Sequence, residues 1–212
     1  MSKRTTATEE TADESPRRPV TTGADAAIAA LEAAGVEHAF GLQGGAIMPV
    51  YDSLYHSDIQ HVTMGHEQGA AHAADAYGIV SGEPGVCLAT SGPGATNLVT
   101  GLADADMDSD PMVALTGQVS TDFLGRDAFQ ETDTTGVTMP VTKTNYVSTD
   151  PDTTGHTVGE AFALAEEGRP GPTLVDLPKN VTKGETGEQP VGPELPEDFD
   201  VPNAADGAAV SE

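Results

Sequence analysis

The chain has 212 residues and a formal net charge of −25, from 34 acidic and 9 basic residues. A charge of this sign repels phosphate backbones and anionic headgroups, so we expect neither a nucleic-acid partner nor a membrane surface. The acidic residues are spread along the chain, and their self-repulsion destabilises the fold unless salt screens it. The composition therefore predicts a protein of a salt-rich cytosol, as in a halophile.

Other features also favour a cytoplasmic location. Cys87 is the single cysteine, so no disulfide can form within the chain, which fits a reducing compartment. It lies in an apolar run, where a buried strand residue is expected rather than a nucleophile. No apolar run approaches the ~18 residues of a transmembrane helix. Residues 1–20 lack the apolar core of a signal peptide.

In chain order, the sequence predicts a tail, one folded domain and a linker. Residues 1–20 are polar and should be disordered. Residues 21–183 form the domain, with helix 24–34, strand 37–40, helix 47–55, strand 59–63, a helix from Glu67, strand 86–90, helix 95–105, strands 111–116 and 145–148, helix 157–165 and strand 173–177. This alternation predicts an α/β fold, a parallel sheet with helices on both faces. Residues 184–212 are rich in Gly, Pro and acidic residues and are predicted to be an acidic linker.

Glu67 is the leading candidate for chemistry. It lies where strand 59–63 gives way to an alanine-rich helix, at the carboxyl end of a strand, where open α/β sheets bind ligands. Walls formed by Ala70, Ala71 and Ala74 would partly desolvate its carboxyl group, and a group held between two protonation states can exchange a proton with a ligand. The plainer interpretation is a first-turn glutamate that stabilises the helix dipole.

No metal ligands are predicted in this chain. His66-Glu67 is the start of an H-E-x-x-H zinc motif, but the next histidine, His72, follows six residues after His66. Six residues turn a helix by about 600°, so the two histidines point to different faces. Glycine turns at 41–45 and 91–94 could bind phosphate through backbone N–H groups, although neither matches the Rossmann or Walker A pattern.

Several segments together resemble a known family. Those at 40–46 and 66–74 resemble the pyrimidine-binding domain of thiamine-diphosphate enzymes. The order and wording of further segments resemble the acetolactate synthase (acetohydroxyacid synthase) large subunit: Thr90-Ser91-Gly92-Pro93-Gly94-Ala95-Thr96-Asn97, Thr116-Gly117-Gln118-Val119, Asp127-Ala128-Phe129-Gln130-Glu131, Pro140-Val141-Thr142-Lys143 and Gly168-Arg169-Pro170-Gly171-Pro172. The resemblance covers about residues 22–183.

This resemblance implies a role for Glu67. It would hydrogen-bond the ring nitrogen of the cofactor's aminopyrimidine and promote the tautomer that takes the thiazolium C2 proton. The enzyme would then decarboxylate pyruvate and join the product to a second 2-oxoacid, pyruvate or 2-oxobutyrate, in branched-chain amino acid biosynthesis. The cofactor is the electron sink, and the protein supplies orientation and proton control.

Further roles follow from the resemblance. Gln130 matches a glutamine that contacts thiamine diphosphate, and Gly45 and Ala46 match backbone that approaches the cofactor of a partner subunit. Arg169 matches an arginine that touches FAD. The resemblance also assigns four residues to the substrate channel: Phe129, Lys143, Lys179 and Ser120, the last of which replaces a proline at the channel mouth.

The chain also departs from the family pattern. Gln43 replaces a usual proline, and Gly65 replaces the usual arginine before the His-Glu pair. Asp110 stands where a small or apolar residue is usual, and Met139 replaces a common arginine. No Gly-Asp-Gly occurs, although the family holds Mg²⁺ and the diphosphate through that segment of a second thiamine-binding domain. We therefore expect half a cofactor site, no activity of the chain alone, and association as a homodimer or with a diphosphate-domain chain. A regulatory small subunit is a further expected partner.

Two alternatives stay open. One is a non-catalytic binding or interaction module derived from this domain, which the replaced arginine at Gly65 favours. The other is another thiamine-diphosphate carboligase or decarboxylase. Glu67 argues against glyoxylate carboligase, which lacks this glutamate, and the run 127–131 favours acetolactate synthase over decarboxylases.

Overall fold

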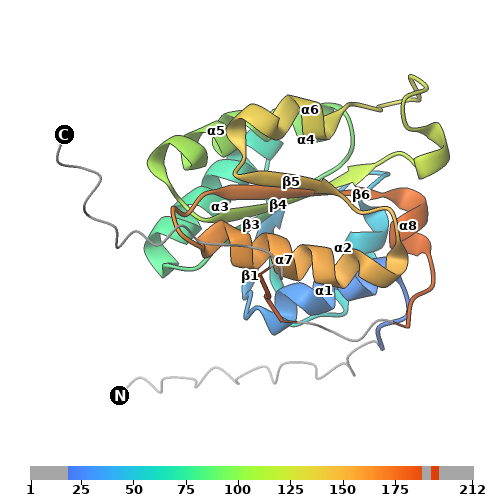
Figure 1. Cartoon of the computed structure of the whole chain (residues 1–212), viewed down its shortest axis with the longest axis horizontal. Helices are drawn as coiled ribbons and strands as arrows, with labels where there is room; N and C mark the ends of the chain where they lie inside the picture. Colours follow the sequence, from blue (N-terminus) through green and yellow to red (C-terminus); the bar gives the residue numbers. More distant parts are fainter. Residues whose placement is uncertain (1–18, 188–191, 196–212) are drawn as a thin grey trace, which may run out of the picture.

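A computed structural model describes residues 19–187 and 192–195. Its centre is a six-stranded, all-parallel sheet in the order β2-β1-β3-β4-β6-β5 (Figure 1). The strands are β1 (His38–Gly41), β2 (Gln60–Thr63), β3 (Gly85–Ala89), β4 (Met112–Gln118), β5 (Thr144–Val147) and β6 (Pro172–Pro178). The predicted α/β fold with a parallel sheet is confirmed.

Helices cover both faces of the sheet (Figure 1). One layer contains α1 (Gly23–Ala33), α2 (Met48–Tyr55) and α7 (Thr154–Glu166), and the other contains α3 (Glu67–Ser81), α4 (Pro93–Asn97), α5 (Val99–Asp108) and α6 (Thr134–Thr138). Every residue of β3, β4 and β6 is buried, as expected for strands covered on both faces. Short elements complete the fold: η1 (Thr121–Phe123), η2 (Met139–Val141), η3 (Pro151–Thr153) and α8 (Lys179–Lys183).

The two layers enclose different apolar cores. The core under α1, α2 and α7 contains many large side chains, among them Leu31, Leu115 and Phe162. The core under α3 and α5 is rich in alanine and includes Cys87, which is fully buried. Burial raises the pKa of the Cys87 thiol to about 12. A thiol in this state is a packing residue rather than a nucleophile.

The structure corrects some predicted elements. The helix expected over 95–105 begins earlier, at Pro93, and is divided into α4 and α5 at the fully buried Leu98. The short helices α6 and α8 were not predicted. The first residues of the predicted linker are fixed to the start of the domain, because Glu185 forms an antiparallel bridge with Thr22 and Gly184 O accepts from Gly23 N at 3.0 Å.

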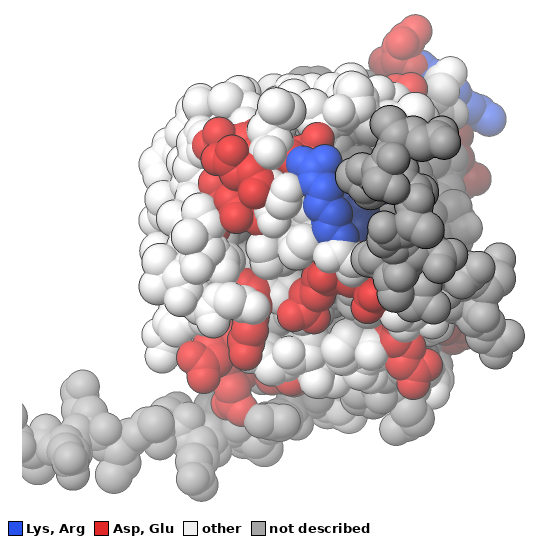
Figure 2. Space-filling view, turned by 60° about the vertical axis from the view of Figure 1, so that its left-hand side comes forward, with Lys and Arg blue, Asp and Glu red and all other residues white. Residues whose placement is uncertain are grey.

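The surface carries the charge that the composition predicts. On the face in Figure 2, acidic side chains form several separate groups, with basic side chains near the centre and at the upper right edge, so no continuous acidic tract faces one way there. Within the described ranges, no helix is long and apolar enough to cross a membrane. The predicted disorder of residues 1–18 and most of the predicted linker lie outside the described residues.

Candidate functional site

Glu67 lies at the carboxyl edge of the sheet, as the first residue of α3 just after β2. The preceding His66 caps this helix, since its Nδ1 accepts a hydrogen bond from Gln68 N at 3.1 Å. Glu67 is half-buried, and its Oε2 accepts a hydrogen bond from Asn97 Nδ2 at 3.0 Å. Asn97 is the last residue of α4, so the next crossover of the fold holds the carboxylate in place.

The glycine turn 91–94 lies between Glu67 and Gln130. A Cβ built on Gly94 would lie 3.5 Å from Glu67 Oε1, so this turn passes directly beside the carboxylate. Gly92 has a φ of +59°, and a Cβ there would lie 2.6 Å from the Gln130 carbonyl oxygen. Glycine is therefore required at position 92 both by backbone conformation and by close approach. The Glu67 carboxylate and the Gln130 backbone, two predicted parts of the cofactor site, thus lie beside the same turn.

A buried polar network supports the loop that carries Gln130. Gln118 Nε2 donates to Asp176 Oδ2 at 2.8 Å and to Thr132 O at 2.9 Å, while its Oε1 accepts from Val119 N at 2.8 Å. Thr116 Oγ1 donates to Asp176 Oδ1 at 2.6 Å. Burial raises the pKa of Asp176 to about 6, and these hydrogen bonds partly oppose the rise. Sequence analysis missed this network, although polar residues within two apolar strands were a signal for it.

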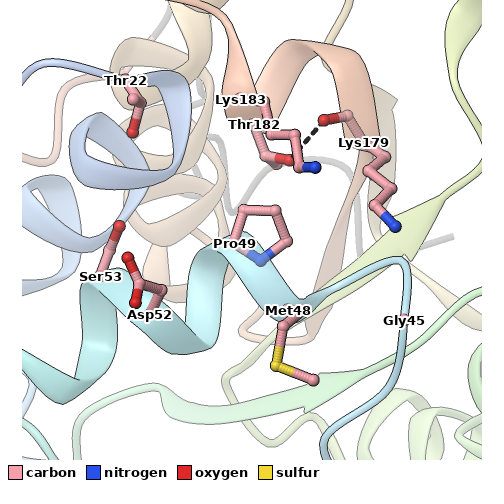
Figure 3. Close-up of a pocket in the computed structure, with 9 residues that line it drawn as sticks. All are labelled: Thr22, Gly45, Met48, Pro49, Asp52, Ser53, Lys179, Thr182 and Lys183. Carbon is pink, nitrogen blue, oxygen red and sulfur yellow. Dashed lines mark hydrogen bonds between the residues drawn. The ribbon is translucent and has the colours of Figure 1, made fainter.

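Lys179 and Gly45 line a cavity of about 690 Å³ at the same edge of the sheet. Lys179 begins α8 and extends toward the segment that carries Gly45, with Asp52 and Ser53 of α2 on the other side (Figure 3). A Cβ on Gly45 would meet no atom within 4 Å, so a ligand can reach this backbone. Glu67 does not line this cavity.

The loop after β4 holds two further predicted channel residues. Ser120 precedes η1, and Phe129 is 88% exposed, so no described part of the chain covers its ring. Asn180 of α8 fixes the start of the loop, since its Oδ1 accepts from Thr121 N and its Nδ2 donates to Thr121 Oγ1, both at 2.9 Å. The helix α8, which begins with Lys179, therefore also anchors the start of this loop.

Two predicted site residues lie at the opposite edge of the sheet. Lys143 precedes β5 and Arg169 precedes β6, so both are at the amino ends of the strands, away from Glu67. Lys143 Nζ donates to the Glu167 carbonyl oxygen. Arg169 Nε donates to Ser109 Oγ at 2.8 Å, and its Nη2 donates to the Asp106 carbonyl oxygen. The substrate role of Lys143 and the FAD role of Arg169 stay predictions, and within this chain Arg169 supports the end of α5.

The edge around Glu67 can hold a nitrogen heterocycle. A carboxylate that accepts one hydrogen bond from an amide keeps lone pairs for a second donor, such as a protonated ring nitrogen. Ala70, Ala71 and Ala74, which were expected to wall this carboxylate, are fully buried in the alanine-rich core.

Comparison with known proteins agrees with this geometry. Residues 21–137 match the family described as thiamine pyrophosphate enzyme, N-terminal TPP binding domain. The chain is 57% identical over 165 residues to the acetolactate synthase large subunit of Corynebacterium glutamicum, which covers 77% of this chain and 26% of that protein. It is 56% identical over 163 residues to the probable acetolactate synthase large subunit of Methanocaldococcus jannaschii, covering 77% of this chain and 28% of the relative.

The acetolactate synthase of Mycobacterium bovis is 55% identical over 177 residues, which are 82% of this chain and 29% of that protein. The chain thus spans between a quarter and a third of the length of these relatives. Because the family match extends over more than half of the chain and includes Glu67, Asn97 and Gln130, the chain belongs to the thiamine pyrophosphate enzymes and carries their N-terminal TPP-binding domain.

Proposed function

We propose that this chain supplies the pyrimidine-binding half of an acetolactate synthase large subunit. The observation that carries this proposal is the position of Glu67, at the carboxyl edge of the sheet, hydrogen-bonded by Asn97 and beside the glycine turn that also touches Gln130. The names of the similar proteins support the reaction: decarboxylation of pyruvate and transfer to a second 2-oxoacid.

Each residue has a separate task in this proposal. Thiamine diphosphate, when bound, supplies the electron sink for decarboxylation. Glu67 holds a proton on the pyrimidine ring nitrogen, Asn97 orients the Glu67 carboxylate, and Gln130 gives a further polar contact. The backbone at Gly45 and Ala46 faces the cofactor of a partner subunit, so the proposal includes a homodimer.

Other parts of the proposal reach beyond this domain. Mg²⁺ and the diphosphate are assigned to a second thiamine-binding domain, and a regulatory small subunit is a further proposed partner. FAD would receive one contact from this chain, at Arg169, whose side chain already donates to Ser109 and to the end of α5.

Four residues are proposed to line the substrate path: Lys179, Ser120, Phe129 and Lys143. A salt-rich cytoplasm is the proposed location, because a net charge of −25 needs screening.

A glutamine in place of Glu67 tests the proposal. The chain is joined to the central and diphosphate-binding domains of the Corynebacterium glutamicum relative, and acetolactate formation and C2–H exchange of bound thiamine diphosphate in heavy water are measured. Glu67→Gln keeps the shape and removes the acid, so both rates should fall ~10²–10⁴-fold, the usual share of general acid–base catalysis. Cofactor binding should fall less, because the amide can still hydrogen-bond the pyrimidine.

Glu83→Gln is the matched control, since it makes the same chemical change on an exposed residue just after the other end of α3. It should leave both rates unchanged. Equal exchange rates in the parent and Glu67→Gln proteins would contradict the assigned role and favour a non-catalytic binding module.

A further inference from the structure

Three side chains that the proposed reaction does not use converge between α3 and α5. His72 and Asp75 lie one turn apart on α3, and Asp104 lies on α5. One nitrogen of His72 and one carboxylate oxygen from each aspartate lie within 4.8 Å of one another. His72 Nδ1 and Asp104 Oδ2 are 3.4 Å apart. About eight residues of helix, or ~12 Å of helix length, separate Asp75 from Glu67, so this group is distinct from the candidate active site.

Asp75 is the buried member of this group. Asp75 is 7% exposed, and its Oδ1 atom is buried without a hydrogen-bond partner. Such an oxygen in a native fold calls for an explanation, because burying an unpaired polar atom is costly. The Asp75 carboxylate also interacts with the negative charges of Asp110 and Asp104 and with His72.

The spacing suits a divalent cation. Zn²⁺ binds histidine nitrogen and carboxylate oxygen at about 2.0–2.2 Å, which places the ligand atoms of a tetrahedral site about 3.3–3.6 Å apart. The His72–Asp104 distance is already in this range, and the Asp75 oxygen lies within 4.8 Å of the other two ligand atoms. His72 and Asp104 are 39% and 55% exposed, so water can reach the fourth position.

We propose that His72, Asp75 and Asp104 form a binding site for a first-row divalent cation such as Zn²⁺, with Asp110 beside it. The sequence predicted no metal ligands, because the spacing of His66 and His72 excludes one known motif, whereas this site needs a residue from a second helix. A bound ion would neutralise the buried Asp75 carboxylate and cross-link α3 to α5. This proposal stands independently of the proposed catalytic function.

Titration of the full 212-residue chain with Zn²⁺ tests the proposal. Calorimetry in about 1 M KCl, where the acidic surface is screened, should show one saturable Zn²⁺ site per chain, and binding should raise the melting temperature. Loss of a supporting partner already costs about 10–100-fold in metal affinity. Loss of a ligand in His72→Asn or Asp75→Asn should therefore weaken binding at least ~10-fold. Mg²⁺, which prefers all-oxygen sites, should bind more weakly than Zn²⁺.

His156→Asn is the matched control. His156 also lies beside a carboxylate, with its Nε2 3.7 Å from Glu160 Oε2, but it is not part of the metal-binding group. Zn²⁺ affinity should be unchanged in this variant. His72 is part-exposed, so His72→Asn should fold, and circular dichroism checks this. Absence of a saturable site, or equal affinity in the parent, His72→Asn and His156→Asn proteins, would overturn the proposal and leave an ordinary His72–Asp104 ion pair.

Discussion

Removing the buried charge of Asp176 should change how the stability of this domain depends on pH. Asp176 lies on β6, is 1% exposed, and accepts hydrogen bonds from Thr116 and Gln118. Burial raises its pKa from 3.8 to about 6 despite these bonds. Asp176→Asn keeps the volume of the side chain and removes the titrating group.

The size of the effect follows from the coupling between protonation of Asp176 and unfolding. Between pH 4 and pH 6 the folded protein keeps a proton on Asp176 that the unfolded chain has released, so this group lowers the free energy of unfolding as the pH rises. A pKa that rises from 3.8 to about 6 corresponds to about 3 kcal/mol, which is nearly absent at about pH 3 and nearly complete at about pH 7. The stability of Asp176→Asn relative to the parent should therefore increase by about 2 kcal/mol from pH 4 to pH 7.

Urea denaturation at constant KCl measures this difference, because urea leaves the ionic strength unchanged. The altered hydrogen bonds of the asparagine add a constant offset, which cancels when the two pH values are compared. Asp122→Asn, at an exposed position in η1, controls for the loss of one negative charge. If the curves for Asp176→Asn and the parent run parallel across this range, the carboxyl group does not titrate as the structure requires, and the reasoning is refuted.

Two further predictions concern the site turn and the surface. Gly92→Ala places a Cβ 2.6 Å from the Gln130 carbonyl oxygen at a φ of +59°, so it should destabilise the domain by more than ~1 kcal/mol, the lower end of the cost of a sparsely populated backbone conformation alone; an unchanged urea midpoint would contradict the contact. The melting temperature should rise between 0.1 M and 1 M KCl, because the screening length falls from ~10 Å to ~3 Å. A melting temperature that stays constant would remove the argument for a salt-rich cytosol.

Local sequence patterns determined the main elements of this protein. Alternating strands and helices predicted the parallel sheet, because helical and strand periodicities are properties of neighbouring residues. The turn from β2 into α3 is a local feature, and it alone predicts Glu67 at a carboxyl strand end. Helix ends were less predictable: the break at Leu98 coincides with a fully buried residue, and burial depends on the whole fold.

Tertiary structure alone decided which side chains meet. Asn97 reaches Glu67 across thirty residues, because successive crossovers of a parallel sheet bring their carboxyl ends to one edge. The same topology places Lys143 and Arg169 at the other edge, although the family resemblance groups them with the site. His72 and Asp104 likewise meet only because α3 packs on α5. Sequence spacing fixes the face of one element, whereas a site needs the relative placement of several, which core packing sets.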